Sequence, residues 1–150
     1  MKRPLIASIL SLFALGLAPL PVIAWDFTSN PICSVTHQDE TIRVDLTYNH
    51  ATEIYAISLT KPDAPWAKSD EFSMRFEGHR PKFISTNRHE FSADGRTITA
   101  ADTGFGNVLD GLQYNTLAAA IAENERIFVS LIGAYPHVEA FRKCVAALRI

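Results

Sequence analysis

An alternation of apolar and polar residues with a period of two limits most strongly what this chain can fold into. In residues 41–48 the apolar set is Ile42, Val44, Leu46 and Tyr48, and polar residues stand between them. A period of two places one set on each face of an extended strand, so this segment predicts a strand with one buried face. Residues 53–60 alternate in the same way after a turn at 49–52, and they predict an antiparallel partner strand.

The pattern continues to about residue 101. Phe72, Met74 and Phe76 alternate with polar residues, and a turn at 78–81 separates them from a short strand at 82–85. A further turn at 93–96 joins 89–92 to 97–101, whereas the Pro-rich segment 61–65 excludes regular structure. Strands spaced this regularly predict an antiparallel β-sandwich or a partly open barrel.

The last third of the chain has a different pattern. The Ala-rich segment 117–124, with Thr116 as its cap, predicts a short helix from intrinsic propensity. Residues 126–132 are almost continuously apolar and predict a central strand that is covered on both faces. A second helix is expected from Pro136, with an inward face made of Val138, Phe141, Val145 and Leu148. The expected fold is therefore mainly β (α+β), with one or two short helices near the C-terminus.

The first 24 residues have the layout of a cleavable signal peptide. Lys2 and Arg3 precede an apolar run at 5–17, and Val-Ile-Ala ends the segment. The predicted cleavage after Ala24 leaves residues 25–150 as one domain, periplasmic or secreted and without a membrane span. A transmembrane anchor is the alternative, but the uninterrupted run is about 13 residues against the roughly 20 that a bilayer requires.

Charge excludes some classes of function. The whole chain has Lys+Arg 14 and Asp+Glu 16, and the domain without Lys2 and Arg3 carries a net charge of −4. This composition argues against a disordered tail and against a nucleic-acid-binding protein.

Cys33 and Cys144 are the two cysteines of the chain, so they allow one intramolecular disulfide. Such a bridge would join the final helix to the first strand. Two free buried thiols are the alternative. A redox-catalytic pair is disfavoured because the chain has no C-x-x-C spacing.

Asp102-Thr103-Gly104 is the sharpest catalytic motif, because aspartic proteases place an Asp on such a turn. In such proteases a later apolar-apolar-Gly sequence completes the site, but Leu131-Ile132-Gly133 lies too close to Gly104 in the sequence for this role. We therefore expect Asp102-Thr103-Gly104 to form a solvated turn. The five histidines lack metal-ligand spacing, and the chain has neither a nucleophile elbow nor a phosphate-binding loop. We therefore expect no metal, no cofactor and no catalytic centre, with Asp102 as the remaining catalytic candidate.

Two features are candidates for binding. The first is a basic segment that contains Arg75, Arg80, Lys82 and Arg88, which would suit an anionic envelope component or an acidic partner. The intervening acids favour the alternative of ordinary charged outer strand faces. The second is Trp66 in the Pro-rich loop, which is either a lid over the core or an exposed anchor for a partner.

Ser130, Leu131 and Gly133, with Ala140 on the helix that follows, resemble the pattern of the small exported bacterial proteins of the invasion-associated locus B type. The resemblance implies a β-rich periplasmic domain without a known catalytic centre. The expected function is non-enzymatic binding of an unknown envelope or extracellular protein, by a monomer or weak dimer. One alternative is inhibition of a hydrolase through the Trp66 loop. The other is an aspartic-type hydrolase that uses Asp102, in a dimer or with His89 or Glu90.

Overall fold

The computed structural model describes residues 16–17 and 25–150. The predicted signal peptide therefore lies almost wholly outside the described residues, as does the residue after which cleavage is expected. No helix within the described part of the chain is both long and apolar enough to cross a membrane.

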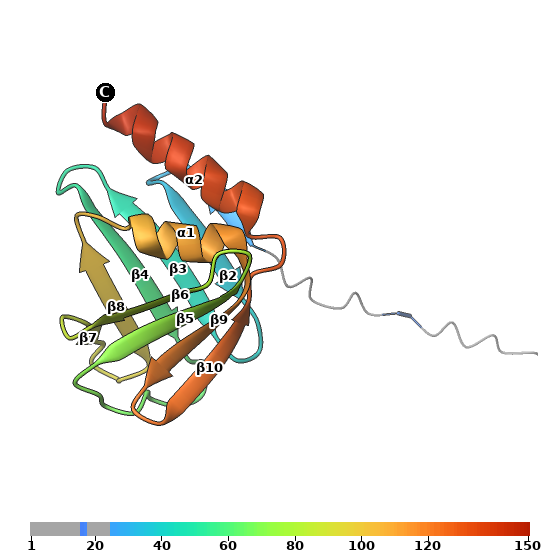
Figure 1. Ribbon diagram of the computed structural model, residues 1–150, viewed down its shortest axis with the longest axis vertical. Coiled ribbons are helices and arrows are strands. Elements are labelled where there is room, and N and C mark those ends of the chain that lie inside the picture. The colour runs from blue at the N-terminus through green and yellow to red at the C-terminus, as the bar shows by residue number, and fades with distance from the viewer. Residues whose placement is uncertain (1–15, 18–24) are drawn as a thin grey trace, which may run out of the picture.

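Residues 25–150 form two antiparallel sheets that pack face to face as a sandwich (Figure 1). The strands of the six-stranded sheet, in spatial order, are β1 (Asp26–Thr28), β2 (Ser34–Gln38), β3 (Arg43–Asn49), β4 (Ile54–Thr60), β8 (Thr97–Asp102) and β7 (Glu90–Phe91). Those of the four-stranded sheet are β10 (Glu125–Ser130), β9 (Asn115–Ala122), β5 (Phe72–Gly78) and β6 (Lys82–Thr86). Two helices, α1 (Gly106–Tyr114) and α2 (Tyr135–Leu148), lie over one end of the sandwich. This architecture confirms the predicted β-sandwich and excludes a closed barrel.

The β3–β4 hairpin follows the predicted alternation. Val44 lies opposite Leu59 and Leu46 opposite Ile57, and all four side chains are buried. The polar residues between them face outward, so the period of two fixes which face of this sheet meets the core.

The helix predicted at 117–124 is wrong, because this segment is strand β9 in the middle of the four-stranded sheet. Its small side chains Ala118, Ala120 and Ala122 are fully buried. On the neighbouring strand β5 they lie opposite Phe76, Met74 and Phe72 respectively. Alanine leaves room for these larger side chains, so tertiary packing overrides its helix propensity.

The prediction of a central, doubly buried strand at 126–132 is also wrong. Strand β10 pairs with β9 alone and forms one edge of its sheet. Val129 is buried, whereas Phe128 on the opposite face is 57% exposed. The apolar residues of this run therefore lie on both faces of β10, and only one of these faces is buried.

Helix α1 was not predicted from the sequence, although Val108, Leu109 and Leu112 have helical spacing. Its Gly111 packs directly on the ring of Phe76, and a Cβ at this position would lie 2.5 Å from that ring. The lack of a side chain at Gly111 therefore allows α1 to pack closely against the four-stranded sheet.

Helix α2 begins within one residue of the predicted position and buries Val138, Phe141 and Val145 as expected. Leu148 is 39% exposed and extends past the core. The predicted disulfide joins Cys33, just before β2, to Cys144 on α2, with their Cα atoms 6.0 Å apart.

Candidate functional site

A cavity of about 280 Å³ lies between the two sheets, at the side where β6 faces β8. Most of its wall is apolar and comes from both sheets and from the start of α1. The apolar side chains include Ile57, Met74, Ile84, Ala100, Phe105 and Val108. Because β6 pairs with β5, and β8 pairs with β4 and β7, the two sheets meet here through side chains alone. Small residues such as Ala100 and Gly104 leave the remaining space open.

An ion pair lies at the mouth of this cavity. An Nη2–H of Arg88, in the crossover from β6 to β7, donates to Oδ2 of Asp102 at the end of β8 over 2.8 Å. The main-chain N–H of Thr103 donates to Oδ1 of Asp102 over 2.7 Å. This hydrogen bond, followed by the charge of Arg88, holds the pKa of Asp102 below its ordinary value. Asp102 is therefore a carboxylate at neutral pH.

A second cation lies near the same mouth. Nζ of Lys82 donates to Oδ1 of Asn107, which lines the cavity, over 3.3 Å. Asn107 belongs to the first turn of α1, which has no acidic residue and no side-chain cap. The charged side chains of the cavity wall are therefore Arg88 and Asp102, and Lys82 contacts this wall only through Asn107.

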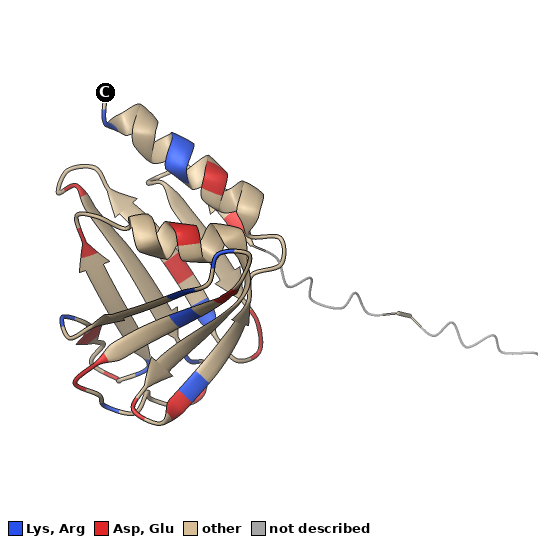
Figure 2. Cartoon of the chain, viewed as in Figure 1, with Lys and Arg blue, Asp and Glu red and all other residues tan. Residues whose placement is uncertain are grey.

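The four basic residues that the sequence singled out have different neighbours. Arg88 lines the cavity and Lys82 contacts the cavity residue Asn107, whereas Arg75 points from the outer face of β5 and pairs with Glu77 at 3.1 Å. The guanidinium of Arg80 lies 4.2 Å from the ring centre of Tyr114. Positive and negative positions are interspersed over the elements in Figure 2. These residues therefore have separate partners, and a role of this segment in binding stays a prediction.

Trp66 is a lid over the core. It is 3% exposed, its indole N–H donates to the carbonyl of Leu59 over 3.1 Å, and its ring packs edge-on against Phe72. Lys61 lies above the ring, and it also pairs with Glu125. The alternative of an exposed anchor is wrong because the indole is already buried and hydrogen-bonded within the protein.

The geometry around Asp102 does not resemble a protease dyad within one chain. Its partners are Arg88 and Thr103, and no second carboxyl of the described residues is hydrogen-bonded to it, whereas a protease dyad shares one proton between two carboxyls. Across residues 25–150, no group of three or more His, Cys, Asp or Glu side chains is placed to hold a metal ion.

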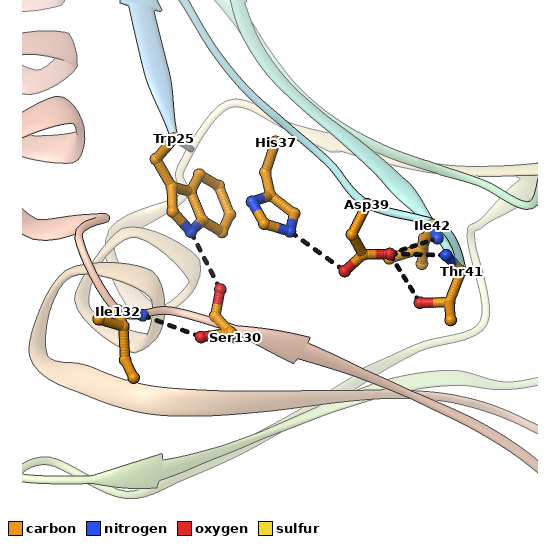
Figure 3. Close-up of polar contacts among 7 residues, drawn as sticks. All are labelled: Trp25, His37, Asp39, Thr41, Ile42, Ser130 and Ile132. Carbon is orange, nitrogen blue, oxygen red and sulfur yellow. Dashed lines mark hydrogen bonds and ion pairs between the residues drawn. The ribbon is translucent and has the colours of Figure 1, made fainter. Parts of the chain in front are cut away.

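A buried aromatic cluster lies where β1 meets the end of β10 (Figure 3). The rings of Trp25 and His37 stack at 4.7 Å, and the indole N–H of Trp25 donates to the carbonyl of Ser130 over 3.0 Å. Nε2 of His37 lies 3.3 Å from Oδ2 of Asp39. Trp25 thus joins the edges of the two sheets on the side opposite to β6 and β8.

Asp39 holds the turn between β2 and β3. Burial raises its pKa, but hydrogen bonds from the hydroxyl and N–H of Thr41 and the N–H of Ile42 outweigh this effect and lower the pKa. Asp39 thus links the buried ring of His37 to this turn, whereas Nδ1 of His37 is buried without a hydrogen-bond partner (Figure 3).

Comparisons with protein-family models, with curated proteins and with solved structures find no match to this chain. The resemblance to the invasion-associated locus B type therefore stays a prediction. In the structure, Ser130 ends β10, Gly133 adopts a positive φ of 84° in the turn that follows, and Ala140 lies on α2.

Proposed function

We propose that this protein binds a small, mainly apolar molecule in the cavity between its sheets, as a non-enzymatic binding protein of the periplasm or the extracellular space. The observation that carries the proposal is the cavity of about 280 Å³ with its mainly apolar wall. Concave, largely apolar sites with a few polar groups at one end are typical of small-molecule binding. The disulfide between Cys33 and Cys144 supports the compartment, because such bridges persist in oxidising environments.

The volume limits the size of the ligand. At roughly 30 Å³ per water molecule, the cavity has room for about nine water-sized groups, or a chain of about eight carbons with a small head group. Burial stabilises each methylene by about 0.8 kcal/mol, so an eight-carbon chain gains roughly 6 kcal/mol. Because immobilising the ligand costs part of this gain, the tightest dissociation constant expected is on the order of 0.1 mM, a range that calorimetry measures.

The test uses 1-octanol and a variant that fills the cavity. Ala100 lies on the inner face of β8 and lines the cavity, so Ala100→Phe occupies part of the space. Ala56→Phe adds the same ring on the outer face of the neighbouring strand β4 and is the matched control. We expect octanol binding to weaken at least about tenfold in Ala100→Phe and to stay unchanged in Ala56→Phe. Thermal unfolding of both variants shows whether each is folded.

Val108→Phe, on the helix side of the cavity, gives a second blocked variant if Ala100→Phe does not fold. Wild-type protein that does not bind octanol, or equal binding by a folded cavity variant and its control, would contradict the proposal.

A further inference from the structure

We propose that the mouth of this cavity selects an anionic head group, so that the ligand is a small amphiphile with one carboxylate or phosphate group that Arg88 binds. This inference rests on the proposed function, because it assigns the chemistry of the same site. The apolar chain occupies the space beside Ile84 and Val108, and the head group lies at the opening.

Arg88 has the donors for this role. Its guanidinium carries five N–H groups in a planar fork, and the hydrogen bond to Asp102 uses one of them. The side chain is 73% exposed, so its remaining N–H groups are accessible from the opening. A guanidinium fork binds a carboxylate or phosphate with two parallel hydrogen bonds.

The ion pair with Asp102 does not block this site. Both side chains are well exposed, 73% for Arg88 and 42% for Asp102, and ion pairs in such positions contribute little. An anionic head group can therefore share Arg88 with Asp102 or replace it. Asp102 competes with the ligand for the same guanidinium.

The charge at the opening favours an anion over the alternatives. Arg88 and Asp102 are the charged side chains of the cavity wall, and Lys82 adds a second cation through its contact with Asn107. The guanidinium of Arg88 would repel an ammonium head group, and a hydroxyl head group would gain no charge-assisted hydrogen bond. All three ligands contact the same apolar wall, so differences in their affinity report the interaction of the head group with the mouth.

The experiment compares four probes that each carry an eight-carbon alkyl chain on the head group by calorimetry: nonanoate, octyl phosphate, 1-octanol and octylammonium. We expect nonanoate, octyl phosphate or both to bind about tenfold more tightly than octanol, which is the range of one charge-assisted hydrogen bond, and octylammonium to bind more weakly than octanol. Comparing the two anions shows whether the head group is a carboxylate or a phosphate.

Three variants assign the preference to the mouth. Arg88→Gln should remove the preference for the anion, so that the anion binds no more tightly than octanol. Asp102→Asn should tighten anion binding about threefold relative to octanol binding, because the competing carboxylate is gone. Arg75→Gln is the matched control, since Arg75 lies on the outer face of β5, and it should change neither affinity.

The failures of the two proposals are distinguishable. Octanol that binds as tightly as both anions, or a preference that survives in Arg88→Gln, overturns the head-group inference and leaves the apolar site standing. If Arg88→Gln does not fold, Asp102→Asn still decides, and anion binding that fails to tighten overturns the inference. Octanol that does not bind at all overturns the proposed function and this inference with it.

Discussion

The disulfide between Cys33 and Cys144 gives the sharpest prediction about stability. It closes a loop with a sequence separation of 111 residues. In the chain-entropy model, a loop of this length lowers the entropy of the unfolded chain enough to stabilise the fold by about 5 kcal/mol, whereas native disulfides typically contribute about 2 to 4 kcal/mol. We therefore expect reduction of the bridge to lower the free energy of unfolding by about 3 to 5 kcal/mol. For a domain of this size the loss corresponds to roughly 10 to 20 °C in Tm.

Urea unfolding at equilibrium, with and without reductant, measures this difference directly. The double variant Cys33→Ala, Cys144→Ala is the control, because reductant should not change its unfolding curve. A loss below about 1 kcal/mol on reduction of the wild-type protein would refute the loop-entropy account of the bridge.

Three further predictions concern the supports of the fold. Phe141 is fully buried on α2, so Phe141→Ala should lower the free energy of unfolding by about 3 to 5 kcal/mol in urea, and a loss under about 1 kcal/mol would contradict its place in the core. Gly111→Ala should destabilise by about 1 kcal/mol, because overpacking against Phe76 outweighs the gain in helix propensity, whereas Gly106→Ala meets no atom within 4 Å and should not destabilise. Because the pKa of Asp39 is lower in the folded chain, its carboxylate stabilises the fold above the unfolded pKa of 3.8, and this contribution is lost as the pH falls through the folded value. Asp39→Asn should therefore cost about 1 to 3 kcal/mol at pH 7 and progressively less below about pH 4, and a cost that does not change with pH would contradict this role.

The sequence predicted those parts of the fold in which local pattern and tertiary environment agree. The β3–β4 hairpin and the inward face of α2 follow their periodicity, and two cysteines leave one possible bridge. Strand β9 could not be predicted from propensity, because Ala118, Ala120 and Ala122 are small only to accommodate the side chains of β5. That requirement becomes visible once the two strands are paired.

The candidate site was predicted only in part. The sequence pointed to Lys82 and Arg88 as members of a basic segment, and to Asp102 as part of a protease motif. The structure places Arg88 and Asp102 in the wall of one cavity, because the crossover from β6 to β7 sets Arg88 opposite the end of β8, and Lys82 contacts the wall residue Asn107. Asn107 and Val108 were missed together with α1, and helical spacing at Val108, Leu109 and Leu112 was the signal that pointed to them.

An NMR titration of methyl groups with nonanoate measures whether a ligand occupies the cavity between β6 and β8. Saturable shifts are predicted for the methyl groups of Ile84, Val108 and Met74, which line the cavity. The methyl groups of Leu117 and Ile121, on the outer face of β9, should not shift. Shifts confined to the outer face, or no shifts at all, would contradict the account.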